Sequence, residues 1–168
     1  MSTYPQWAAG QRVTASLLLA AQPQTIIKTS DQTVTSSTFV DATDLSFTGD
    51  AGAVYIVTSV LSYGAAATPK ILLNWRVPAG ATIQRYPLHA ANAATDTSAT
   101  TVSMRRRAST SANPGVDGTG NFDTFNEWMI LRMSSTAGTV AVQFAQAVTN
   151  ATGSILRADS YIQYNRIA

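Results

Sequence analysis

Beyond Pro23 the hydrophobic residues of the chain recur at every second position. The runs "KILLNWRV" (70–77) and "TVAVQFAQAV" (139–148) each place large apolar side chains on one side and polar or small ones on the other, with Leu72 as the exception. A period of two is that of a β-strand with one buried face. These runs therefore predict strands that cover a hydrophobic core.

Two other runs, "AVYIVTSVLSY" (53–63) and "NEWMILRM" (126–133), are apolar on both faces, which is typical of strands in the middle of a sheet. Turn-forming sequences such as Pro78-Ala79-Gly80 and Asn113-Pro114-Gly115 separate the runs. With weaker runs included, the pattern predicts about nine or ten strands and no long helix after Pro23. We therefore expect residues 24–168 to form one all-β domain, an antiparallel jelly-roll sandwich of about 8–10 strands.

The segment Gly10–Pro23, "GQRVTASLLLAAQP", departs from this pattern and predicts a short helix. Thr14 is a suitable N-cap, good helix formers follow it, and Pro23 ends the helix. A helix of two turns is not stable alone in water. Because Leu17, Leu18 and Leu19 point in different directions around it, we expect another surface to bury them.

Residues 1–23 are accordingly predicted to be an anchor segment that attaches the β domain to another chain. A secretion signal is not expected, because residues 1–11 lack the Lys or Arg that opens such a signal. The apolar run is also much shorter than the roughly 20 residues of a membrane span, so we expect no membrane partner.

Charge is sparse along the whole chain. Asp, Glu, Lys and Arg make up 12 % of the residues, and the formal net charge is +2. A free monomer normally relies on charge to stay apart from its neighbours, so thin charge favours an assembly whose surface is covered. The alternative is an ordinary soluble domain that is rich in Thr.

The only cluster of positive charge is Arg105-Arg106-Arg107. We interpret this run as a contact with another protein subunit, with a solvated loop and a phosphate contact as alternatives. We expect no nucleic-acid partner, because the net charge is too small for such a footprint.

Sequence features of an enzyme are weak. His89 is the only histidine, no Gly-x-Ser-x-Gly motif is present, and there is no cysteine. The run "DGTGNFD" spaces oxygen-bearing side chains at Asp117, Thr119, Asn121 and Asp123, as a calcium loop does. It lacks the Gly and Glu of an EF-hand, so an ordinary polar turn loop is the favoured interpretation. The predictions are no enzymatic activity, no cofactor and no metal.

The C-terminal sequence "GTVAVQFAQAVTNATGSILRADSYIQYNRIA" (138–168) resembles the C-terminal segment of small structural proteins of tailed bacteriophages that infect actinobacteria. Those chains end in a Gly-Thr strand, a "QWAQ"-like centre, an Asn/Thr-rich turn, and "LRAGS" before an aromatic strand. Here Phe144 stands where Trp is common, and Asp159 where Gly is common. The segments "GQRVTASLLLAAQP" and "WRVPAGAT" (75–82) are similar to parts of phage tail and fibre proteins.

This resemblance implies a homotrimeric jelly-roll domain, similar in outline to the tumour-necrosis-factor-like and complement-type heads. The domain would lie on the exterior of a phage particle, as a capsid decoration or a minor tail protein. Its implied partners are copies of itself and other virion proteins. Residues 1–23 would attach it, and subunit contacts are expected at Arg105, Arg106, Arg107, Trp75, Trp128 and Tyr161.

The alternative function is a receptor- or glycan-binding tip of a phage tail. In that case exposed aromatic side chains would stack on sugars, and the candidates are Tyr63, Tyr86 and Tyr164.

Overall fold

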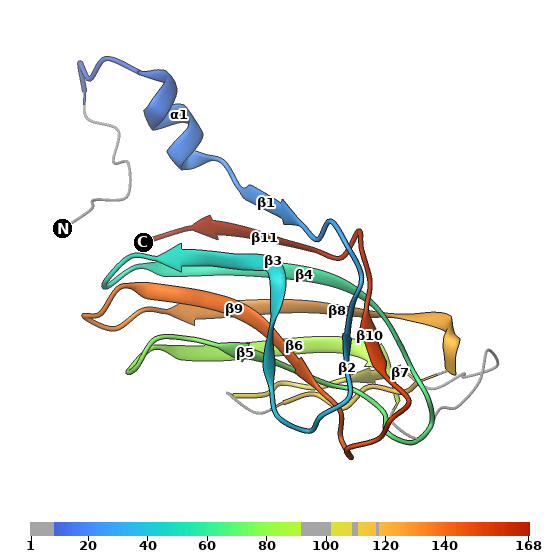
Figure 1. The fold of residues 1–168 in the computed structure, drawn as a ribbon. Helices are drawn as coiled ribbons and strands as arrows, with labels where there is room; N and C mark the ends of the chain where they lie inside the picture. The colour runs from blue at the N-terminus through green and yellow to red at the C-terminus, as the bar shows by residue number, and fades with distance from the viewer. Residues whose placement is uncertain (1–8, 92–101, 109–110, 117) are drawn as a thin grey trace.

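The structure is a computed structural model that describes residues 9–91, 102–108, 111–116 and 118–168. It confirms an all-β sandwich of two antiparallel sheets, preceded by one short helix (Figure 1). The elements are α1 (Ala15–Ala21), β1 (Gln24–Ile27), β2 (Gln32–Val34), β3 (Val40–Gly49), β4 (Val54–Ala65), β5 (Leu72–Arg76), β6 (Thr82–Ala90), β7 (Val102–Met104), β8 (Gly118–Arg132), β9 (Gly138–Ala145), β10 (Ser154–Leu156) and β11 (Tyr161–Arg166).

The larger sheet has the strand order β1-β11-β4-β8-β6-β7, and the short strands β2 and β10 extend it beside β4. The smaller sheet has the order β3-β9-β5. Apart from β8-β6-β7 at one edge, neighbours in each sheet come from opposite halves of the chain, and most of the long connections cross between the sheets, which is the jelly-roll pattern. The described residues hold eleven strands rather than 8–10, because short strands such as β2, β7 and β10 pair through three residues each.

The two runs that are apolar on both faces form most of β4 and part of β8, and both strands lie in the middle of the larger sheet, as predicted. The structure also pairs them with each other. Their inward side chains pack against the smaller sheet. Leu61, Phe125 and Met129 from the larger sheet and Leu73 and Phe144 from the smaller one are all at most 1 % exposed. Burying side chains of this size stabilises the fold by about 1.5–3 kcal/mol each.

Two opposite charges lie inside this core. Arg85 on β6 and Glu127 on β8 form a salt bridge of 2.5 Å between Arg85 Nε and Glu127 Oε1, and both side chains are 1 % exposed. Trp75 on β5, in the opposite sheet, donates its Nε1 hydrogen to Glu127 Oε2 over 2.7 Å. The Arg85 guanidinium also donates to the Leu73 carbonyl and the Asn74 side chain of β5. The pair therefore joins the two sheets through directed hydrogen bonds.

Trp75 was expected at a subunit contact, and this expectation is wrong. Its side chain is 5 % exposed, and its Nε1 hydrogen is already donated to Glu127. Trp75 belongs to the core.

The ion pair makes a prediction about stability. Glu127→Ala removes the counter-charge of a buried guanidinium and should lower the free energy of unfolding by about 3–5 kcal/mol, measured by urea denaturation. Glu127→Gln should cost less, because an amide oxygen can still accept from Trp75. The control is Arg76→Ala, which breaks an exposed pair with Asp41 and should cost less than about 1 kcal/mol. If Glu127→Ala and Arg76→Ala destabilise the protein equally, the core pair does not join the sheets as described.

Candidate functional site

Among the described residues, the outer face of the larger sheet exposes several large apolar side chains to solvent. We call it the outer sheet face and define it by the exposed apolar side chains of β1, β4, β8 and β11: Ile27, Ile56, Trp128 and Tyr161, which are 54 %, 44 %, 46 % and 37 % exposed. In the strand register Trp128 lies opposite Thr58 on one side and opposite Tyr86 on the other. The rings of Trp128 and Tyr86 are therefore neighbours across two strands.

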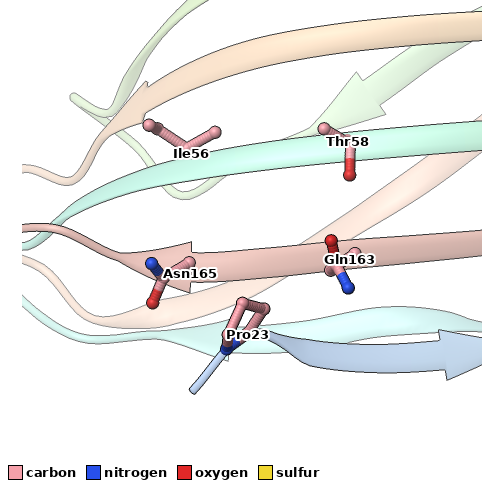
Figure 2. A pocket seen from close by; sticks show the side chains of 5 residues that line it. All are labelled: Pro23, Ile56, Thr58, Gln163 and Asn165. Carbon is pink, nitrogen blue, oxygen red and sulfur yellow. The ribbon is translucent and has the colours of Figure 1, made fainter. Parts of the chain in front are cut away.

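A shallow hollow of about 210 Å³ lies on the outer sheet face, where the N-terminal segment joins the domain. Pro23, Ile56, Thr58, Gln163 and Asn165 line it, and Figure 2 shows Pro23 facing the polar side chains of β11. No charged residue is among them. Its volume lies below the range of about 300–1,000 Å³ that is usual for small-molecule sites, so it suits an inserted side chain better than a ligand.

The N-terminal helix forms where the sequence predicts it. The Thr14 hydroxyl accepts a hydrogen bond of 3.4 Å from the Leu17 amide, which is the predicted N-cap. At the other end the Gln24 side chain donates to the Leu19 and Gln22 carbonyls, and the Leu19 carbonyl also accepts from the Gln22 amide.

The leucines of α1 are not covered by the sandwich. Leu17 is half-buried, but Leu18 and Leu19 are 49 % and 61 % exposed, and α1 stands away from both sheets (Figure 1). Burial of these leucines against another chain remains a prediction.

The arginine cluster lies at the far edge of the larger sheet, just after β7. Arg107 pairs with Arg85 through two backbone hydrogen bonds of 2.7 and 2.8 Å, and its side chain is partly buried. Arg105 and Arg106 are exposed. Because β11 lies at the opposite side of the sheet, Arg105–Arg107 and Tyr161 do not form one cluster.

A second pocket, of about 290 Å³, lies beside this cluster. Arg105 and Arg107 line it together with His89, Ser103 and other polar residues, whereas Arg106 does not. The sequence analysis did not identify this pocket. The sequence does contain one indication of it. Arg85 and His89 share the alternation of the apolar residue Ile83 on β6, so they are expected to point inward with it.

His89 is buried at the inner end of this pocket. Its ring stacks on Phe125 with the centroids 5.4 Å apart, and its Nδ1 lies 2.7 Å from the Ala90 carbonyl oxygen. That contact places the ring proton on Nδ1. The group that orients the ring is thus the backbone carbonyl of Ala90, whereas in a catalytic triad it is a carboxylate.

The aromatic residues proposed to stack on sugars are in different environments. Tyr63 is fully buried, and its hydroxyl donates to the Gly115 carbonyl, so its assignment to a sugar site is wrong. Tyr164 stacks on Phe47 with the centroids 4.0 Å apart and packs against the core. Tyr86 is half-buried beside Trp128 on the outer sheet face.

The predicted polar loop around "DGTGNFD" is a strand over most of its length. Residues 118–123 belong to β8, where side chains alternate between two faces. Asp117 lies outside the described residues. In the part of the chain that the structure describes, no three His, Cys, Asp or Glu residues form a group that could hold a metal ion. In the same part no helix is long and apolar enough to cross a membrane.

The environment of His89 makes a pH prediction. Burial lowers the pKa of His89 below its ordinary value of 6.5, and the nearby Arg107 charge lowers it further, against an opposing effect of the bond to Ala90. The unfolded chain therefore binds the proton first as the pH falls. Stability that is fully present above pH 6.5 should decrease from there down to the folded pKa.

Because His89 is the only histidine, one imidazole signal in an NMR titration of tag-free protein measures this pKa without assignment. When the pH is lowered from neutral to about 5, the free energy of unfolding of His89→Gln should fall less than that of the unchanged protein. A titration midpoint above 6.5 would show that burial does not govern this ring.

Comparison of the chain with protein-family models, with curated proteins and with solved structures finds no match. What can be said of its function comes from three features: the outer sheet face, the exposed leucines of α1, and the arginine-lined pocket.

Proposed function

We propose that the chain is a structural protein of a bacteriophage virion. It forms a homotrimer on the exterior of the particle, as a capsid decoration or a part of the tail, and residues 1–23 attach it. One observation carries the assembly role: a single chain exposes both the outer sheet face and the leucines of α1. The phage assignment rests on the resemblance of residues 138–168 to phage structural proteins.

The outer sheet face has the composition of a contact surface between proteins. Interface centres are rich in aromatic residues and poor in charged ones. Trp128, Tyr161 and Ile56 supply large exposed side chains, and the polar side chains between them on β4 and β11 are uncharged. We assign the contact between copies of the chain to this face.

The helix α1 has a separate role in this proposal. Seven residues are too few for a stable isolated helix, and burial of each leucine side chain is worth about 1.5–3 kcal/mol. That gain becomes available only when another surface covers Leu18 and Leu19. The proposed covering surface is another virion protein, which makes assembly, not catalysis, the function of the chain.

A glycan-binding tip is the second candidate, and the pair Trp128 and Tyr86 favours it. Trp128 is exposed and Tyr86 is half-buried, and two neighbouring rings on one face of a sheet form a surface on which sugar rings stack. The two proposals differ in one respect: a trimer covers these rings, whereas a glycan site keeps them open.

The trimer proposal predicts a mass. Light scattering of the purified full chain at micromolar concentration should give about three times 17.7 kDa. Ile56→Ser with Trp128→Ser should yield folded monomers, because the exchange removes apolar contact area from the outer sheet face. Val148→Ser is the matched control, since Val148 is 59 % exposed but lies outside the larger sheet. A monomer at every concentration of the unchanged protein would exclude the trimer.

The anchor proposal predicts that folding and attachment separate. The double variant Leu18→Ser/Leu19→Ser should unfold at nearly the same temperature as the unchanged protein, because neither side chain touches the core. It should be missing from particles assembled in cells that supply it, as should a chain that lacks residues 1–23. Ala15→Ser, in the exposed first turn of α1, should be incorporated normally. Normal incorporation of the double variant would show that attachment uses the sandwich itself.

A further inference from the structure

The pocket beside the arginine cluster carries an inference that does not depend on the virion proposal. We propose that it binds a small acidic sugar, through the carboxylate or phosphate group that such a ligand carries. The pocket lies between the end of β6 and the described residues Ser103, Arg105, Arg107, Ser111 and Asn113, at the β7 edge of the larger sheet, far from β11.

The charge of the pocket selects an anion. Arg105 and Arg107 both line it, and none of the described residues that line it is acidic. A guanidinium presents its donors in a planar fork that matches the oxygens of a carboxylate or a phosphate. Two such groups at one pocket make a site for a single oxyanion.

Two buried polar atoms at the pocket have no partner among the described residues. They are Nε of Arg107 and Oδ1 of Asn113. The Arg107 side chain is held in place by its NH1 bond to the Ser111 carbonyl, and its backbone is paired with Arg85. Nε is therefore a fixed donor that lacks an acceptor. Buried donors of this kind are rare in folded proteins and are expected to meet a ligand or water.

The remaining polar groups suit the hydroxyls of a sugar. Ser103, Ser111 and Asn113 contribute neutral donors and acceptors around the two arginines. The volume of about 290 Å³ lies just below the usual range of about 300–1,000 Å³ for small-molecule sites, which fits a small ligand, and it is larger than a bare oxyanion needs. A monosaccharide that carries one negative group satisfies both the charge and the volume.

His89 gives a direct reading of occupancy, because it lines the pocket and is the only histidine in the chain. The experiment titrates the full-length protein with glucuronate, with inorganic phosphate and with neutral glucose, and follows the imidazole signal by NMR. Glucuronate should shift this signal in a saturable way at millimolar concentration. Glucose should not shift it.

Three variants identify the site. Arg105→Ala should weaken glucuronate binding about tenfold, because it removes a charge-assisted hydrogen bond. Arg107→Lys should weaken it by a similar factor, since lysine keeps the charge but lacks the fork and the Nε donor. Arg106→Ala is the matched control: it removes the same charge from the same run but does not line the pocket, and it should change the affinity less than twofold.

The outcomes decide the proposal. Saturable binding of glucuronate that depends on Arg105 but not on Arg106 supports it. Binding of phosphate alone would show an adventitious ion only and would overturn the sugar assignment. An unchanged His89 signal, or an equal loss of binding in Arg105→Ala and Arg106→Ala, would overturn the site. If Arg107→Lys does not fold, the comparison of Arg105→Ala with Arg106→Ala still decides.

Discussion

The buried ion pair between Arg85 and Glu127 joins the two sheets and constrains which side chains the larger sheet turns inward. Two charges in an apolar core are tolerated only when their hydrogen bonds are satisfied, and here Trp75 of the opposite sheet completes the set. Because side chains alternate along a strand, turning Arg85 and Glu127 inward turns their neighbours Tyr86 and Trp128 outward. The core contact thus fixes which side chains the outer sheet face presents.

The same arginine also positions the pocket. The backbone of Arg85 pairs with that of Arg107, and this pairing sets the Arg107 side chain at the pocket that His89 lines. The inward orientation of Arg85 on β6 thus affects both the side chains of the outer sheet face and the position of the pocket. The helix α1 is independent of it, since its bonds run to its own N-cap and to Gln24. The proposed attachment, self-association and ligand binding therefore use separate parts of the chain.

The sequence was sufficient for features that depend on local patterns. Alternation located the strands, the two-sided apolar runs identified β4 and β8 as strands in the middle of a sheet, and Thr14 marked the start of α1. The sequence was insufficient for features that depend on which strands pair and which sheets pack together. Alternation cannot tell which face of a strand turns inward, so Tyr63 was assigned to the surface although it is buried. The pairing of Arg85 with Glu127 joins residues that are far apart in the chain, so no local pattern shows it.

The central claim is that another copy of the chain covers the outer sheet face, and the fluorescence of Trp128 tests it most directly. A Trp7→Phe background leaves Trp75, which is buried in the core, and Trp128, which is 46 % exposed in the single chain. Acrylamide quenching should be weak at micromolar concentration and should increase on dilution, as Trp128 becomes accessible while Trp75 stays protected. Strong quenching of Trp128 that does not change with concentration would contradict the account, because the outer sheet face would then be open to solvent.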